Sequence, residues 1–258
     1  MAKGKTGNLA MRYYVLIPVY NEELNIETLH SNLTNVLKDR DVLYVFVDDC
    51  STDGSVGLLK KVFSGQNTHV IEKEENKGPG DSFDKGFRWI LENASDEDDR
   101  IITLEADNTS DLGILSNMLA ISDLGYEMVL SSIYAQGGGF KQTNFFRKIS
   151  SFAANMVFRS LFNINVLTLS SFYRVYRLSV IKRVDDLYNE IISESGFISM
   201  LELLLKAIRA DASVIEVPMV LRSKNRIGKS KMKVFKTAMS YLRFLILKGF
   251  RIVHWKKK

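Results

Sequence analysis

Cysteine, proline and long apolar runs are all scarce in this sequence of 258 residues. The single cysteine, Cys50, excludes an internal disulfide and is compatible with a reducing compartment. Three prolines leave no Pro-rich linker, and apolar runs such as residues 244–247 are far too short for a membrane-spanning helix. Residues 1–12 hold no apolar run of the kind found in a signal peptide. We therefore expect a cytoplasmic protein whose contact with a membrane is confined to its surface.

Acidic residues are absent from residue 217 to the end of the chain, where 13 residues are Lys or Arg. The whole sequence has 35 basic and 30 acidic residues and a formal net charge of +5, which leaves 22 basic and 30 acidic residues, a charge of −8, before that point. A basic arm on an acidic body predicts an anionic partner, such as phosphate groups or anionic lipid. Nucleic acid is disfavoured because no recognition motif accompanies the arm.

Hydrophobic residues make up 46% of the chain, which is enough for one sizeable core. In the first half, short β-branched or aromatic runs alternate with segments of helical periodicity. We predict strands over residues 13–18, 42–47, 69–72, 100–104 and 127–131, and helices over residues 22–37, 56–63, 78–91 and 111–123. This alternation predicts an α/β fold, with a mainly parallel sheet, right-handed crossovers and helices on both faces.

The second half of the chain has a different pattern. Gly137, Gly138 and Gly139 suggest a flexible joint, and the sequence then predicts helices over residues 145–162, 195–210 and 231–250 and a strand over residues 213–217. No repeat or low-complexity linker divides the chain. We expect a flexible N-terminus over residues 1–12, one domain over residues 13–220, and a basic loop with an amphipathic helix over residues 221–258.

Three acidic motifs each follow a predicted strand: Pro18-Val19-Tyr20-Asn21-Glu22, Asp48-Asp49 and Glu105-Ala106-Asp107. Ligands of such sheets bind outside the carboxyl ends of the strands, so we expect the three motifs to converge on one edge. Glu105 and Asp107 are two residues apart and can hold one Mg²⁺ or Mn²⁺ ion, which would neutralise a leaving diphosphate. Two solvated acids at a strand end are the alternative when this motif is taken alone.

The motif that begins at Asp48 also has a structural alternative. Asp48 and Asp49 can accept hydrogen bonds from a base or a ribose. Asp53 or Ser51 can instead cap the helix that follows. We assign Asp53 to capping, and Asp48 and Asp49 to the ligand.

The first motif lies at a strand-to-helix turn. Tyr20 can pack on a base and Glu22 can bind a ribose, but a proline turn with Asn21 as the helix N-cap explains the same residues. A dehydrogenase is disfavoured because no G-x-G-x-x-G follows the first strand.

Taken in order, these motifs resemble the family-2 glycosyltransferases of the GT-A fold, which have a P-x-Y-N-E turn, a D-D-x-S-x-D loop and a D-x-D metal motif. The likeness continues through residues 76–80, 132–139, 147–151 and 170–177. It also includes the E-V-P region at residues 216–218 and the R-x-x-G-x-S-K region at residues 226–231, where Lys231 is in register but Arg226 lies one position from the usual basic residue. This order is typical of the polyprenyl-phosphate glycosyltransferases, the dolichol-phosphate mannose synthases among them. The resemblance covers about residues 13–248.

The resemblance implies a role for each matching residue. Asp107 would be the principal metal ligand, and Arg226 and Lys231 would face the diphosphate. Arg147 and Ser151 would bind the acceptor phosphate. The remaining residues implied at the nucleotide are Pro18, Tyr20, Glu22, Asp48, Asp49, Glu105 and Ala106.

Besides the shifted Arg226, three positions carry a residue that departs from the family pattern. Glu105 stands where the family usually has Asp, which keeps the carboxylate but changes its reach. Thr109 stands in place of a Gln that would be a third metal contact, and Ile133 in place of an Arg that would face the acceptor phosphate.

The implied reaction is metal-dependent transfer of a hexosyl unit from a GDP- or UDP-sugar to a polyprenyl phosphate, with inversion at the anomeric carbon. A phosphate monoester is largely a dianion at neutral pH, so it needs no general base. One alternative is transfer to a sugar hydroxyl, for which Glu194 is the candidate base, unless it only favours a helix N-terminus. Another is a catalytically silent nucleotide-binding subunit, suggested by Glu105 and Thr109.

The basic arm contains a helix with one apolar face, flanked by Lys and Arg, with Trp255 near its end. That pattern resembles an interfacial helix, which suits an enzyme whose acceptor lies in a bilayer. An ordinary helix packed on the sheet is the alternative. The apolar face consists of Val234, Phe235, Ala238, Tyr241, Leu242, Leu245 and Ile246.

Overall fold

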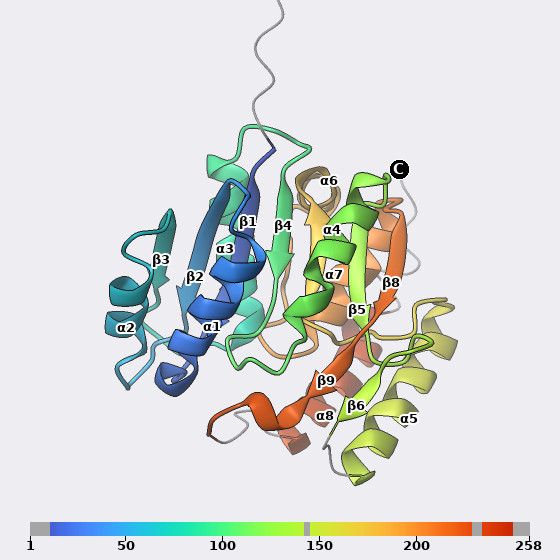
Figure 1. Ribbon diagram of the computed structural model, residues 1–258. Coiled ribbons are helices and arrows are strands. Elements are labelled where there is room, and N and C mark those ends of the chain that lie inside the picture. The colour runs from blue at the N-terminus through green and yellow to red at the C-terminus, as the bar shows by residue number, and fades with distance from the viewer. Residues whose placement is uncertain (1–10, 142–144, 229–233, 250–258) are drawn as a thin grey trace, which may run out of the picture.

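The computed structural model describes residues 11–141, 145–228 and 234–249 (Figure 1). A seven-stranded sheet forms its centre, in the order β3-β2-β1-β4-β7-β5-β8. Six of these strands match the predicted ones to within one residue at each end, which confirms the α/β prediction. The strands are β1 (Tyr13–Val19), β2 (Val42–Asp48), β3 (Thr68–Glu72), β4 (Arg100–Thr103), β5 (Met128–Ser132), β7 (Arg174–Arg177) and β8 (Val214–Pro218).

Helices cover both faces of the sheet (Figure 1). One face carries α1 (Glu23–Val36), α2 (Ser55–Val62) and α4 (Leu115–Asp123), with a short 3-10 turn over Leu112–Ile114 before α4. The other face carries α3 (Pro79–Asn93), α6 (Leu178–Tyr188) and α7 (Ser199–Arg209). The parallel pairs β1·β2, β1·β4 and β2·β3 place the carboxyl ends of these strands along one edge.

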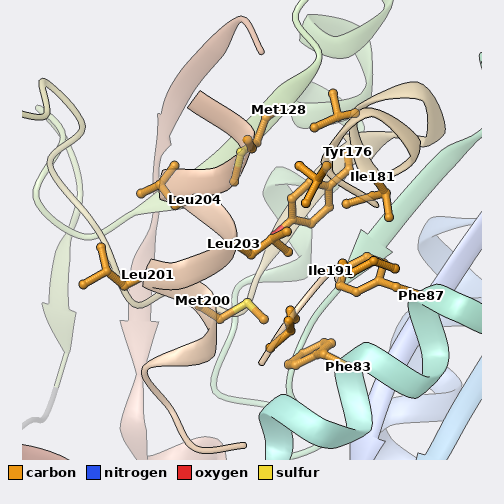
Figure 2. Close-up of a cluster of buried hydrophobic side chains, with 14 of the residues drawn as sticks. Phe83, Phe87, Met128, Tyr176, Ile181, Ile191, Met200, Leu201, Leu203 and Leu204 are labelled. Atoms are coloured by element: carbon orange, nitrogen blue, oxygen red, sulfur yellow. The ribbon is translucent and has the colours of Figure 1, made fainter. Parts of the chain in front are cut away.

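The core on the second face lies between α3, α7 and the sheet (Figure 2). Phe83 and Phe87 are four residues apart, so both project from one side of α3. They meet Tyr176 of β7 and Met200 of α7, and all four side chains are fully buried. Burial of each such side chain contributes about 1.5–3 kcal/mol. This layer holds the amino end of α3 firmly at the carboxyl edge.

β7 and α6 were not predicted from the sequence. β7 lies antiparallel between β4 and β5, where Arg174 pairs with Thr103 on one side and Leu130 on the other. The strand has only four residues, and two of them are arginines. So short an alternation of polar and apolar residues is too weak to predict a strand. The sheet is therefore mixed rather than wholly parallel.

A second sheet of two strands, β6 (Gly139–Lys141) and β9 (Val220–Arg222), lies beyond the carboxyl edge. β9 continues from β8 (Figure 1). The expected flexible joint is instead a tight turn into β6: a Cβ on Gly138 would lie 2.4 Å from Ser132 O, and Gly137 has a φ of 93°. Only glycine permits so close a backbone approach.

The second half ends with two neighbouring helices at the carboxyl edge. α5 (Phe145–Phe162) matches the predicted helix, and α8 (Val234–Phe244) is followed by a π-helical turn over Leu245–Gly249. The rings of Phe158 and Tyr241 meet edge to face with centroids 5.1 Å apart. Within the described residues, no helix combines the length and apolarity needed to cross a membrane.

Candidate active site

A cavity of about 1070 Å³ opens at the carboxyl ends of the strands. All three acidic motifs contribute to its wall, so their predicted convergence on one edge is confirmed. The predicted site residues in its lining are Pro18, Tyr20, Glu22, Asp49, Glu105, Ala106, Asp107 and Arg226.

Hydrogen bonds to both carboxylate oxygens hold Asp49 in place. Oδ1 accepts hydrogen bonds from Lys73 Nζ at 2.6 Å and Lys77 N at 2.9 Å, and Oδ2 accepts one from Gly78 N at 2.8 Å. These contacts tie the segment before α3 to the end of β2. Gly78 has a φ of 97°, which glycine adopts without strain. The cavity wall beside Asp49 is therefore rigid.

Asp48 does not line the cavity, although its role was predicted to be ligand binding. Asp48 is the last residue of β2 and Asp49 is the first residue after it, and only Asp49 reaches the cavity lining. Asp48 Oδ2 accepts from Ser51 N at 2.9 Å and braces its own loop. Asp53 was predicted to cap α2, but the N-cap is Gly54; Asp53 lies one residue earlier, and its Oδ1 accepts from Ser55 N at 3.0 Å at the start of the helix.

The turn at residues 18–22 brings Tyr20 and Glu22 to the cavity. Asn21 is not the N-cap of α1: it has a left-handed φ of 53°, and its Oδ1 accepts from Thr52 N at 2.7 Å. The left-handed conformation directs the Asn21 side chain towards the loop after β2. That contact, with Glu22 N donating to Ser55 Oγ at 2.8 Å, joins two of the acidic motifs.

Asp107 is buried in the turn after β4, with each carboxylate oxygen engaged. Oδ1 accepts from Thr109 N at 3.0 Å and Thr109 Oγ1 at 2.7 Å. Oδ2 forms an ion pair with the Arg226 guanidinium. Thr109, which stands in place of a possible metal ligand, therefore braces Asp107 instead.

The oxygens at this point fit a hard divalent cation. Glu105 and Asp107 both line the cavity, and a cation there would share the Asp107 carboxylate with Arg226, which is already paired with it. Mg²⁺ is commonly held by one or two carboxylates, with phosphate oxygens and water completing its shell. Residues 11–141, 145–228 and 234–249 contain no cluster of three or more His, Cys, Asp or Glu that could hold a metal by themselves.

An apolar part of the cavity lining, the apolar wall, comes from residues outside the three acidic motifs. Tyr241, whose pKa is raised to about 12 by burial, faces the cavity from α8. Ile133, which stands in place of an expected Arg, makes this wall apolar beside β5. The other apolar residues of this wall are Phe140, Phe172, Met219, Leu221 and Met239. No local pattern predicts that these five residues form one surface, because they come from four separate segments of the chain.

Glu194 lines the cavity on a loop held from behind by Glu202. The Glu202 carboxylate is buried and accepts hydrogen bonds from Glu194 N at 2.8 Å and Ser193 Oγ at 2.6 Å, while Lys206 Nζ lies 2.8 Å away. The sequence predicted a helix from residue 195, but α7 begins at Ser199, so Glu194 lies in a loop rather than at a helix start.

Three predicted residues cannot be placed. Lys231 lies outside the described residues, and the side chains of Arg147 and Ser151 on α5 are not described. Their roles stay predictions.

Comparison with known proteins agrees with the family that the order of the motifs suggests. The model of the family described as Glycosyl transferase family 2 matches residues 14–185, which is more than half of the chain. A polyprenol monophosphomannose synthase of Mycolicibacterium smegmatis is 27% identical over 223 residues, covering 86% of this chain and 81% of that protein. A dolichol-phosphate mannosyltransferase of Pyrococcus furiosus is 28% identical over 249 residues. The match covers 95% of this chain but only 65% of the relative, so the chain spans less than two thirds of its length.

Solved structures share the fold at low identity. Glucosyl-3-phosphoglycerate synthase from Mycobacterium tuberculosis, solved with Mn²⁺, UDP and glucosyl-3-phosphoglycerate, has a TM-score of 0.62 and 16% identity, covering 93% of this chain and 80% of that one. Another mycobacterial protein has a TM-score of 0.66 and 13% identity, covering 96% and 76%. The chain thus belongs to glycosyl transferase family 2 and is a glycosyltransferase enzyme with the GT-A fold.

Proposed function

We propose that this enzyme transfers a hexosyl unit from a GDP- or UDP-sugar to a polyprenyl phosphate, with Mg²⁺ or Mn²⁺ at Glu105 and Asp107. One observation carries the proposal: a single cavity joins a carboxylate-rich end at the sheet to an apolar wall at α8. The first end suits a nucleotide and its metal, and the second suits a lipid chain. The relatives, a polyprenol monophosphomannose synthase and a dolichol-phosphate mannosyltransferase, support the same acceptor class.

At the donor end, Tyr20, Glu22 and Asp49 are placed to hold the nucleoside. A divalent metal, when bound, would withdraw charge from the leaving diphosphate. Arg226, beside Asp107, is placed to neutralise the same diphosphate. The Mn²⁺ and UDP named with the mycobacterial synthase support this arrangement.

At the acceptor end, the attacking group would be the oxygen of a phosphate monoester. This group is largely a dianion at neutral pH, so no side chain has to remove a proton. The protein then contributes position and charge, which favours Arg243 in the cavity lining and the predicted Arg147, Ser151 and Lys231. Direct displacement of the nucleotide by this oxygen inverts the anomeric carbon.

A peripheral contact with the cytoplasmic face of the membrane would bring the acceptor to this cavity. α5 and α8 lie side by side at the carboxyl edge, and each exposes large apolar side chains. Met239 both lines the cavity and is 50% exposed, so the apolar wall continues to the surface. The other exposed apolar residues of α5, α8 and the turn after α8 are Phe152, Met156, Val157, Leu161, Leu242, Ile246 and Leu247. Apolar side chains beside a basic segment are typical of interfacial helices.

Transfer to a sugar hydroxyl is a second candidate, because Glu194 lines the cavity and could serve as the base that a hydroxyl acceptor needs. The position of Glu194 on a loop fixed by Glu202 gives it a defined orientation.

A matched assay separates the two. GDP- and UDP-hexoses are offered with Mg²⁺ or Mn²⁺, together with either a short-chain polyprenyl phosphate or a free oligosaccharide, and the products are identified by mass spectrometry. We expect a hexosyl polyprenyl phosphate, no product from Asp107→Ala, and near wild-type transfer by Glu194→Gln. Product on the oligosaccharide alone, abolished by Glu194→Gln, would favour the second candidate. Equal background activity in the wild type and Asp107→Ala would contradict both.

A further inference from the structure

Asn25, in the first turn of α1, has 1% of its surface exposed and does not line the cavity. Its side-chain amide nevertheless makes three hydrogen bonds at the cavity margin. Nδ2 donates to Glu22 Oε2 at 2.6 Å and to Ile227 O at 3.1 Å, and Oδ1 accepts from Ile227 N at 3.0 Å. One side chain thus joins the carboxylate at the nucleoside subsite to the main chain next to Arg226.

The pair of bonds to Ile227 fixes the direction of that segment as well as its position. A carboxamide presents a donor and an acceptor in one plane, so it can satisfy the N–H and the C=O of the same residue. Ile227 is followed by Gly228, whose φ of 98° turns the chain away. Because Asn25 is buried, loss of these bonds would leave polar groups without partners.

The turn after β4 holds the same segment from the other side. Arg226 pairs with Asp107, and Asn108 Nδ2 donates to Asn25 O at 2.9 Å. Arg222 N donates to Thr109 O at 3.0 Å. Residues 222–227 are therefore anchored at both ends across the Asp107 carboxylate.

We propose that Asn25 is a positioning residue that couples the nucleoside subsite to the diphosphate subsite by holding Glu22 and the Arg226 segment in one geometry. This inference rests on the proposed function. A nucleoside at Glu22 would find Arg226 already beside Asp107, where the diphosphate binds. Such preorganisation removes the cost of ordering the segment during binding.

The test is a double-mutant cycle on nucleotide binding. Calorimetry in Mg²⁺ measures the Kd of GDP and UDP, and of GMP and UMP, for the wild type, Asn25→Ala, Arg226→Ala and the double variant. We expect Asn25→Ala to weaken binding of the preferred diphosphate by about tenfold. We expect a smaller effect on its monophosphate. In the Arg226→Ala background, Asn25→Ala should weaken binding of the diphosphate no more than binding of the monophosphate, because the two residues act through each other.

Two further variants make the result interpretable. Asn35→Ala, on the exposed side of the same helix, should bind like the wild type. Asn25→Asp keeps the acceptor for Ile227 N but sets a second carboxylate against Glu22, so it should bind the diphosphate no better than Asn25→Ala.

Equal diphosphate losses from Asn25→Ala in the two backgrounds would overturn the coupling, as would wild-type affinity in Asn25→Asp. A wild-type protein that binds neither nucleotide would overturn the proposed function as well, so the two failures are distinguishable.

Discussion

The Lys73 ammonium lies 2.6 Å from Oδ1 of Asp49, and both side chains are almost fully buried. Asp81 Oδ2 is also 2.6 Å from the same nitrogen. One buried cation therefore balances two carboxylates directly behind the nucleoside subsite. Lys73 itself does not line the cavity, so its influence on a ligand passes through Asp49.

Replacement of Lys73 by Met should lower the free energy of unfolding by about 3–5 kcal/mol, because it leaves Asp49 buried without a counter-charge. Urea unfolding measures the change. Lys60→Met is the matched control: it breaks an ion pair with Glu72 of the same 2.6 Å length, but both side chains are more than half exposed, so it should cost no more than about 1 kcal/mol. Similar losses in the two variants would contradict this account.

The same site allows stability and binding to be separated. Lys73→Met combined with Asp49→Asn removes a buried charge of each sign, so part of the lost stability should return. Nucleotide affinity should not return, because Asp49 is the residue that lines the cavity. Recovery of both would show that Asp49 does not contact the ligand.

Gly80 lies where α3 meets the loop that carries Glu194. A Cβ at this position would be 1.9 Å from Glu194 O and 2.7 Å from the Ser199 Cβ. Gly80→Ala should therefore lower the free energy of unfolding by about 1–3 kcal/mol and reduce transfer, because the loop must move. Gly57→Ala, in α2 with no atom within 4 Å of its Cβ, should instead raise stability by up to about 1 kcal/mol. Thermal unfolding compares them, and a neutral Gly80→Ala would rule out the close contact.

The exposed apolar residues of α8 and the following turn predict binding to lipid. Leu242→Glu with Ile246→Glu should weaken binding to anionic vesicles at low salt by about tenfold or more, because each change removes apolar surface and adds charge. Vesicle sedimentation measures the bound fraction. Leu124→Glu is the control, since Leu124 is 81% exposed but follows α4 at the opposite edge of the sheet. Absence of wild-type binding would remove support for the membrane contact.

His69 makes stability depend on pH. Its ring stacks on Trp89 with centroids 4.1 Å apart, and burial lowers its pKa. Below the unfolded value of about 6.5, the unfolded chain binds more protons than the folded one. The contribution of His69 is thus complete above that pH and is lost as the pH falls through the lowered pKa. His69→Phe keeps the stacking without the proton, so its stability should fall less between about pH 7.5 and 5.5. Equal falls in the urea midpoint of the wild type and of His69→Phe would contradict the lowered pKa of His69.

Much of the fold could be predicted because its signals are local. The run that forms β2 and the helical spacing of α3 are each contained within one segment. Strand and helix periods differ, so short windows distinguish them. β7 was not predicted because two of its four residues are arginines. Arg174 is buried through hydrogen bonds to Leu169 O and Met200 O, and no sequence pattern reveals such contacts.

The sequence by itself determined the alternating strands and helices of the first half and the meeting of Asp49, Glu105 and Asp107 at one edge, because parallel strands bring their carboxyl ends together. Only the tertiary structure decided that Asp48 braces its own loop instead of lining the cavity, and that Arg226 meets Asp107. It also decided that Asn25 holds Ile227. Asp107 and Arg226 are 119 residues apart, and Asn25 and Ile227 are 202 apart. Such contacts depend on how whole elements pack, and the local spacing of residues along a chain carries no record of that packing.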